Sequence, residues 1–339
     1  MKTAILLINL GTPDAPETGP VRKYLREFLF DGRVIDINPI GRYFLVNGII
    51  APLRAPKSAK IYQEVWTDKG SPLKLYLNEL VDKVQAKYNE DVDVYGAMRY
   101  QNPGLNEVLV KIEKKAYAQV IVLPLYPQYA SSTTGSTAQR VMEIMSKWEV
   151  IPSVNFINNF VLEDSYINSL AKTAEGFDYR EYDKIVFSYH GIPVRHIRKS
   201  CKLPACRENG CISEYTNERM YCYRSACYET SRKITEKLGI PKDKWIQVFQ
   251  SRLGKDPWLE PYAEETVIRL AKEGKKKLLF FSPAFVADCL ETTVEIGVEY
   301  QEVFEEHGGE KIQLVPSLNS NDYWVDAVKE IIDKNRLYK

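Results

Sequence analysis

The sequence predicts a two-domain α/β protein built on parallel sheets. Short apolar runs alternate with helical segments along the chain, and the runs span residues 4–10, 92–95, 119–125, 185–189, 245–249 and 278–282. Strands that alternate with helices of about 10–15 residues are typical of parallel sheets covered on both faces. With 339 residues the chain is long enough for two domains. We place the boundary near residue 160, between domains of residues 1–160 and 161–322.

Helical periodicity marks residues 21–30, 105–115, 137–148 and 323–335. We expect the last of these helices to pack on the N-terminal domain. The loop 126–136 follows a strand and leads into a helix, so its hydroxyl and amide groups are placed to bind an anion. It lacks the glycine and lysine spacing of a P-loop, which argues against nucleotide binding.

Composition and charge exclude several classes of protein. The net charge of +1 offers no electrostatic basis for nucleic-acid binding. No stretch approaches the roughly 20 apolar residues of a membrane span. The first apolar run is shorter than a signal-peptide core and ends at Gly11, Thr12 and Pro13. We therefore expect a cytoplasmic protein without a nucleic-acid partner, and a monomer by default.

His190, one of three histidines, directly follows the apolar run 185–189 and precedes Gly191. It therefore stands at the carboxyl end of a predicted strand, where open α/β sheets place their ligand crevice. A structural, hydrogen-bonded histidine is the alternative interpretation. His307 matches a helix C-terminus, where a cation complements the dipole, and we expect His196 on a surface.

Glu291, Glu295 and Glu299 recur at four-residue intervals after the run 278–282. On an α-helix such residues share one face, and Glu291 falls in the first turn, where the dipole favours a carboxylate. A solvated acidic stripe is the alternative. Carboxylate oxygens suit a divalent cation. With His190 on a neighbouring strand end, they predict a site that moves protons and holds a metal.

Taken together, the motifs resemble those of ferrochelatase, the enzyme of haem synthesis that inserts ferrous iron into a porphyrin. The resemblance covers nearly the whole chain and depends on the order and number of short motifs. These are residues 7–13, 19–25, 70–73, 98–100, 126–129, 188–193 (Ser-Tyr-His-Gly-Ile-Pro), 249–254, 257–259 and 288–292 (Asp-Cys-Leu-Glu-Thr).

The resemblance implies a chelatase-like fold of two similar domains, each a four-stranded parallel sheet flanked by helices. It implies that His190 and Glu291 are catalytic and that His190, Glu291 and Glu295 handle the Fe²⁺ substrate. Residues implied to bind the porphyrin are Leu10, Met98, Arg99, Tyr100, Tyr126 and Trp258. Cys289 stands where some members have a histidine, and we interpret it as a small buried residue.

Residues 28–56 resemble the family's apolar lip, which suits a poorly soluble planar substrate and a peripheral contact with a membrane surface. A core helix is the alternative interpretation for these residues. The location that follows is cytoplasmic, with or without such a membrane contact.

Five of the six cysteines lie between residues 201 and 227. Their spacing differs from the paired motif of zinc ribbons, and a cytosolic enzyme is not expected to carry disulfides. The segment 198–227 resembles a cysteine-rich insert that binds a [2Fe-2S] cluster in some microbial members. Cys227 matches a cysteine of relatives without the insert, so the implied ligands are Cys201, Cys206, Cys211 and Cys222. Zinc or free thiols are the alternatives.

The predicted function is insertion of Fe²⁺ into protoporphyrin IX with release of two protons. Within enzymes the rivals are a ferrochelatase acting on coproporphyrin III and a chelatase for cobalt or nickel. Outside enzymes, the rivals are a porphyrin or haem carrier and an iron–sulfur redox sensor on the same scaffold.

Overall fold

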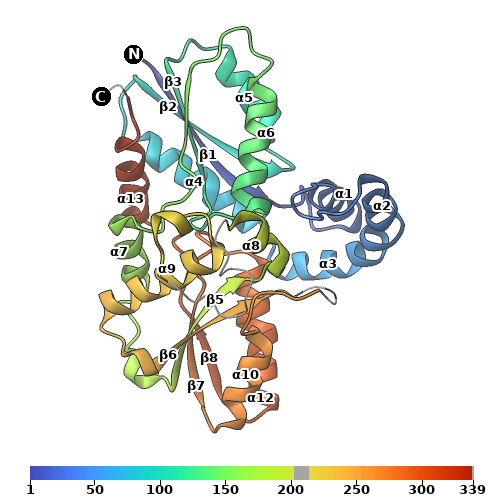
Figure 1. The fold of residues 1–339 in the computed structure, drawn as a ribbon, viewed down its shortest axis with the longest axis vertical. Coiled ribbons are helices and arrows are strands. Elements are labelled where there is room, and N and C mark those ends of the chain that lie inside the picture. Colours follow the sequence, from blue (N-terminus) through green and yellow to red (C-terminus); the bar gives the residue numbers. More distant parts are fainter. Residues whose placement is uncertain (202–213, 253, 255, 338–339) are drawn as a thin grey trace. The chain divides into compact units, whose positions relative to one another are not determined.

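The computed structural model describes residues 1–201, 214–252, 254 and 256–337, which form two compact units (Figure 1). Unit 1 comprises Met1–Tyr126, Ser131–Asn159 and Asn319–Lys339, and unit 2 comprises Pro127–Ala130 and Phe160–Leu318. Each unit contains one four-stranded parallel sheet with helices on both faces. The predicted fold class is therefore confirmed.

The sheet of unit 1 has the strand order β2-β1-β3-β4. Its strands are β1 (Thr3–Gly11), β2 (Val92–Tyr100), β3 (Gln119–Pro124) and β4 (Ser153–Phe156). Its helices are α1 (Thr18–Leu29), α2 (Pro39–Phe44), the π-helix η1 (Leu45–Ile50), α3 (Ala51–Val65), α4 (Pro72–Gln85), α5 (Leu105–Glu113), the π-helix η2 (Ser131–Gly135), α6 (Ser136–Met145) and α13 (Asp322–Asp333).

The apolar run of β1 is buried because helices cover both faces of its sheet. Ala4, Leu6 and Ile8 pack in one cluster with side chains of α5 and α6. On the other face α4 packs against β2, close enough that a Cβ on Gly96 would lie 2.9 Å from Val81. The helix α13 packs on α4 (Figure 1). Continuous apolar strands are expected for parallel sheets of this kind.

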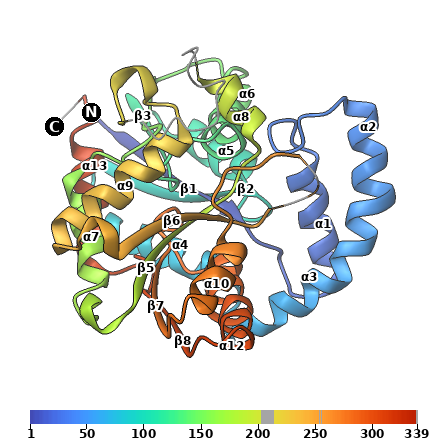
Figure 2. The same cartoon turned by 60° about the horizontal axis from the view of Figure 1, so that its bottom comes forward.

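The helices α1 and α3 form a group apart from the sheet of their own unit (Figure 2). They pack on each other through Val21, Leu25, Ala55 and Ala59, and Tyr100 of β2 joins this cluster. Large apolar side chains on the remaining surface of the group are 43–69% exposed. They are Ile37, Ile40, Tyr43, Phe44, Ile49 and Leu53.

The sheet of unit 2 has the strand order β6-β5-β7-β8. Its strands are β5 (Lys184–His190), β6 (Trp245–Gln250), β7 (Lys277–Phe281) and β8 (Lys311–Leu314). Its α-helices are α7 (Asp164–Thr173), α8 (Val194–Ser200), α9 (Tyr223–Leu238), α10 (Ala263–Lys272), α11 (Leu290–Thr293) and α12 (Gln301–Glu306). The described part of unit 2 also contains the π-helix η7 (Glu295–Tyr300) and the 3₁₀ turns η3 (Tyr179–Glu181), η5 (Asn217–Arg219) and η6 (Lys242–Lys244).

The core of unit 2 repeats the arrangement of unit 1. Val186, Val248 and Phe280 of the sheet pack with α10, η7 and α12, while α9 covers the other face, where Tyr189 and Ser231 share a hydrogen bond of 2.9 Å. Because β5 lies between β6 and β7, its carboxyl end is flanked by the ends of both neighbours. This edge carries His190.

Three local expectations differ from the structure. The edge strands β4 and β8 are not among the predicted apolar runs, because each has only four residues and a polar, exposed beginning. The loop 126–136 contains the π-helix η2 and gives its last residue, Ser136, to α6. His196 is buried in α8, with 8% exposure, and is not a surface residue.

In the described residues no helix is both long and apolar enough to cross a bilayer.

Candidate active site

His190 ends β5, and its ring orientation is set by the backbone that follows. Its Nδ1 lies 2.7 Å from the carbonyl oxygen of Gly191. A carbonyl can only accept, so Nδ1 carries the hydrogen, and Nε2 of the neutral imidazole keeps the lone pair. The backbone oxygen of His190 accepts a hydrogen bond of 2.9 Å from the Tyr223 hydroxyl. Nε2 is thus the basic atom of the ring.

Gly191 is required by close packing beside the histidine. Its nitrogen donates a 2.8 Å hydrogen bond to the carbonyl oxygen of Gln250. A Cβ at position 191 would lie 2.8 Å from that same oxygen and 3.2 Å from the ring of Trp258. A side chain there would separate β5 from β6 at the edge of the sheet where His190 lies.

Glu291 lies in the first turn of α11, as predicted, where the helix dipole favours a carboxylate. Cys289 is the N-cap, and its nitrogen donates a 3.0 Å hydrogen bond to the hydroxyl of Thr292. Burial raises the pKa of the Cys289 thiol, and the neighbouring carboxylate of Glu291 raises this pKa further. Cys289 is therefore a neutral thiol that helps to begin the helix.

Glu295 begins η7 and is held by four hydrogen bonds from uncharged donors. Its Oε1 accepts from the nitrogen of Ser251 at 2.9 Å and from the hydroxyl of Tyr300 at 2.9 Å. Its Oε2 accepts from Nε2 of Gln250 at 2.8 Å and from the hydroxyl of Ser251 at 2.6 Å. A carboxylate offers about four acceptor positions, so these bonds occupy the usual capacity of Glu295.

The expected regular α-helix through Glu291, Glu295 and Glu299 is replaced by a short α-helix and a π-helix. The α-helical segment α11 covers four residues, and η7 follows with i→i+5 hydrogen bonds such as that from Glu299 N to Val294 O, 2.9 Å. Glu291 therefore belongs to α11, whereas Glu295 and Glu299 belong to η7. Glu295 is half-buried, whereas Glu299 is exposed.

Asp288 has a largely structural setting. Its Oδ1 accepts hydrogen bonds from the Thr292 hydroxyl at 3.3 Å and from the Ser317 nitrogen at 3.2 Å. Across residues 1–201, 214–252, 254 and 256–337, no three His, Cys, Asp or Glu side chains are grouped to hold a metal ion.

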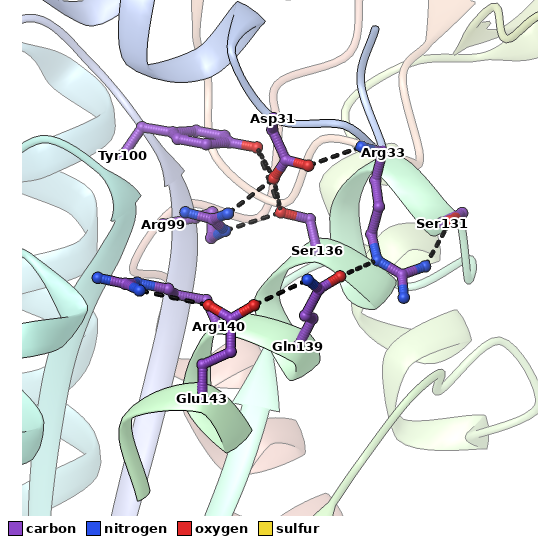
Figure 3. Close-up of polar contacts among 9 residues, drawn as sticks. All are labelled: Asp31, Arg33, Arg99, Tyr100, Ser131, Ser136, Gln139, Arg140 and Glu143. Carbon is purple, nitrogen blue, oxygen red and sulfur yellow. Dashed lines mark hydrogen bonds and ion pairs between the residues drawn. The ribbon is translucent and has the colours of Figure 1, made fainter. Parts of the chain in front are cut away.

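A second polar cluster lies in unit 1 around Asp31 (Figure 3). Asp31 Oδ2 lies 2.7 Å from the Arg99 guanidinium, and it also accepts from the Tyr100 and Ser136 hydroxyls. Its Oδ1 accepts from the nitrogen of Arg33 at 2.7 Å. We call these five residues the Asp31 cluster.

The electrostatics of the Asp31 cluster favour an ionised carboxylate. Burial raises the pKa of Asp31, but the hydrogen bonds from Ser136 and Arg33 and the charge of Arg99 outweigh burial and lower this pKa. The side chains of Asp31 and Arg99 are only 9% and 14% exposed. The hydroxyl of Ser136, which the sequence pattern assigns to a bound anion, is therefore used by a carboxylate of the chain itself.

Arg33 extends the cluster to the start of α6. Its guanidinium donates to the Ser131 hydroxyl at 2.8 Å and to Oε1 of Gln139 at 2.6 Å. Gln139 in turn donates to Glu143 (Figure 3). The segment between α1 and α2 is thereby tied to β2, η2 and α6.

The residues expected to bind porphyrin occupy varied environments. Met98 and Tyr100 are buried within unit 1, whereas Leu10 and Tyr126 are half-buried there. Arg99 is engaged by Asp31 and lies 4.5 Å from the ring centroid of Tyr100. Trp258, in unit 2, is half-buried and forms a bridge with Pro193, three residues after His190.

Three of the clustered cysteines lie in the described chain. Cys201 follows α8 and is half-buried, and Cys222 is the buried N-cap of α9. Cys227 is completely buried in α9, and burial raises the pKa of its thiol. Cys206 and Cys211 lie outside the described residues.

Sequence reasoning missed the roles of Asp31, Gln250 and Ser251. Gln250 and Ser251 fall within motif 249–254, which was recognised without a role for either. Ser251 has a φ of 63°, a left-handed conformation that is uncommon outside glycine. Apolar periodicity does not reveal polar contacts between distant segments. The motif 249–254 was therefore the only feature of the sequence that pointed to Gln250 and Ser251.

Comparison with known proteins identifies the family of the chain. The Ferrochelatase family model matches residues 2–336. A ferrochelatase of Legionella pneumophila is 40% identical over 334 residues, which cover 98% of this chain and 99% of that protein. A ferrochelatase of Coxiella burnetii is 42% identical over 337 residues, covering 98% of this chain and 94% of that protein.

The fold also matches a solved chelatase. SirB from Bacillus subtilis with Fe³⁺ aligns with a TM-score of 0.56 and 11% identity, covering 99% of this chain and 96% of that one. At this identity the match concerns the fold alone. The family match and the two relatives decide the function: the chain belongs to the ferrochelatase family and is a metal chelatase that inserts ferrous iron into a porphyrin.

Proposed function

We propose that the porphyrin is protoporphyrin IX and that His190 and Glu291 carry out its metalation. The observation that supports the roles of these two residues most is that a basic Nε2 stands at the end of β5 and a carboxylate stands in the first turn of α11. Gln250 contacts the backbone beside both residues. In the reaction, two pyrrole N–H bonds break, bonds from iron to nitrogen form, and two protons leave.

His190 and Glu291 divide this work between them. The lone pair of Nε2 can accept a pyrrole proton or ligate Fe²⁺. The carboxylate of Glu291 can accept the second proton or guide the cation. Glu295 is proposed to act on Fe²⁺ by its charge, because direct ligation would break one of its four hydrogen bonds.

Porphyrin contacts are proposed for residues of each unit. In unit 1 these are Leu10, Met98, Arg99, Tyr100 and Tyr126, and in unit 2 Trp258. The exposed apolar side chains between Ile37 and Leu53 support a surface for an apolar substrate and a peripheral membrane contact. The proposed location is cytoplasmic, at or near such a membrane surface.

A [2Fe-2S] cluster bound by Cys201, Cys206, Cys211 and Cys222 is proposed as a cofactor. A cluster needs four thiolates, and the burial that raises the pKa of Cys227 disfavours a thiolate there. This supports Cys227 as the cysteine that is not a ligand. Anaerobically purified protein that is colourless and free of iron and sulfide would contradict the proposal.

The substrate is tested by mixing anaerobic protein with Fe²⁺ and, separately, protoporphyrin IX and coproporphyrin III. Loss of free-base porphyrin fluorescence reports metalation. Faster turnover of protoporphyrin IX is expected, and faster turnover of coproporphyrin III would favour the alternative substrate. Binding of both without metalation would indicate a porphyrin carrier.

His190→Ala tests the proposed site. Removing the basic nitrogen should lower kcat by about 10²–10⁴-fold while porphyrin still binds. His307→Ala is the matched control, since His307 is the C-cap of α12 and its Nδ1 lies 2.9 Å from the carbonyl oxygen of Val303 in the same helix. Full activity in His190→Ala would disprove the assigned site.

A further inference from the structure

Gln250 connects the strand that ends at His190 with the helix that carries Glu291. It is the last residue of β6 and pairs in register with His190 of β5. Its carbonyl oxygen accepts a hydrogen bond from Gly191, 2.8 Å away. Its side-chain Nε2 donates to the backbone oxygen of Glu291, also at 2.8 Å. One residue therefore holds the backbone at both proposed reacting residues.

The amide of Gln250 is buried and bonded in one orientation. The residue is 1% exposed. Its Oε1 accepts from the Ser188 hydroxyl at 2.6 Å, and the second hydrogen of Nε2 goes to Glu295 at 2.8 Å. A flipped amide would place its oxygen against two acceptors, the carbonyl of Glu291 and the carboxylate of Glu295. Such a mismatch is unfavourable in a buried network.

Glu295 is itself immobilised, so it forms a fixed support for Gln250. Ser251 donates to both carboxylate oxygens, from its nitrogen and from its hydroxyl. It does so in a left-handed backbone conformation, with φ of 63°. Strained conformations of this kind persist where the surroundings over-determine them and are concentrated at active sites. The strain at Ser251 thus serves to fix Glu295 beside Gln250.

We infer that Gln250 is a positioning residue for metalation, which holds His190 and Glu291 in register through its backbone and side chain. The inference rests on the proposed roles of those two residues. Gln250 needs no contact with iron or porphyrin to act in this way. A displacement of about 1 Å between reacting groups can lower a rate by about 10²-fold, so loss of its side chain should affect turnover more than binding.

Gln250→Met tests the inference, with Gln247→Met as the matched control. Gln247 lies on the same strand, but its Oε1 accepts from Ser231 of α9 at 3.2 Å. Gln250→Met should lower kcat by about 10²-fold and leave KM for the porphyrin unchanged. Gln247→Met should keep the wild-type kcat. A merely structural role would instead change thermal stability in both variants without a selective fall in kcat.

Failure of the positioning role and failure of the proposed site would give different results. Wild-type kcat in Gln250→Met, together with an inactive His190→Ala, would overturn the positioning role and leave the proposed site intact. An active His190→Ala would overturn the site itself.

Ser188→Ala keeps the inference testable if Gln250→Met does not fold. It removes only the hydroxyl that orients Oε1 of Gln250. We expect a smaller fall in kcat than the fall predicted for Gln250→Met. Where Gln250→Met folds, we expect no additional fall when the two substitutions are combined, because both act through one contact. Wild-type kcat in Ser188→Ala, or additive effects in the double variant, would contradict the inference.

Discussion

Asp31 in unit 1 and Glu295 in unit 2 are both half-buried carboxylates with several hydrogen bonds, yet their electrostatic surroundings differ. Asp31 pairs with the guanidinium of Arg99 at 2.7 Å. Glu295 accepts all four of its hydrogen bonds from uncharged donors. The first carboxylate is paired with a cation of the chain, whereas none of the hydrogen-bond donors to the second is a cation.

This difference bears on the roles that we assign to the two carboxylates: Asp31 joins segments of the fold, and Glu295 is proposed to act on Fe²⁺. A neutralised pair such as Asp31 and Arg99 joins segments of the fold and exerts little net field outside itself. A carboxylate fixed by dipoles alone still attracts a cation in its vicinity. Glu295 begins the helical segment that follows α11, which carries Glu291, and this position is consistent with the proposal that its charge acts on Fe²⁺.

Asp31→Asn should produce the largest loss of stability. The substitution leaves the guanidinium of Arg99 buried without its counter-charge, and breaking such a buried pair costs about 3 kcal/mol. Urea denaturation of the two proteins measures this difference. The control is Asp14→Asn, at an ion pair with Lys23 whose side chains are 37% and 66% exposed, where we expect less than about 1 kcal/mol. Equal losses of unfolding free energy in Asp31→Asn and Asp14→Asn would contradict the structural role of the Asp31 cluster.

The stabilising effect of Asp31 should depend on pH. Its pKa is lower in the folded chain than the ordinary value of 3.8, so the unfolded chain binds the proton more readily. The stabilisation is therefore fully present above pH 3.8 and is lost as the pH falls through the folded-state pKa. The difference in the free energy of unfolding between the wild type and Asp31→Asn should become smaller at acidic pH. If this difference stayed constant as the pH fell through the folded-state pKa of Asp31, the ion pair of Asp31 with Arg99 would be contradicted.

Glu295→Gln should have the smallest effect on stability and a clear effect on activity. It replaces an acceptor by a donor within the hydrogen-bond network, but it also removes a charge that no cation among its bonding partners neutralises. These effects oppose each other, and we expect a net loss of about 1 kcal/mol. We also expect KM for Fe²⁺ to rise, because the field that attracts the cation is lost. An unchanged KM for Fe²⁺ would show that the charge of Glu295 does not act on the substrate.

The linear pattern of the chain determined much of the fold and the centre of the site. Apolar runs such as residues 185–189 specify buried parallel strands whatever their neighbours, because both faces must be covered. His190 could be placed at a strand end for the same reason. The short edge strands β4 and β8 could not be predicted from apolar runs, because they become strands only through pairing with β3 and β7.

Only the tertiary structure decided how the polar groups are connected. Arg99 reaches Asp31 across 68 positions of sequence, and Gln250 reaches Glu295 across 45. The change from the α-helix α11 to the π-helix η7 was likewise not readable from the four-residue spacing of the glutamates. Periodicity reports which side of an element is apolar, whereas hydrogen-bond partners depend on how separate elements pack. The residue types at the site were therefore readable from sequence, but the assignment of Asp31 to structure and of Gln250 to positioning required the fold.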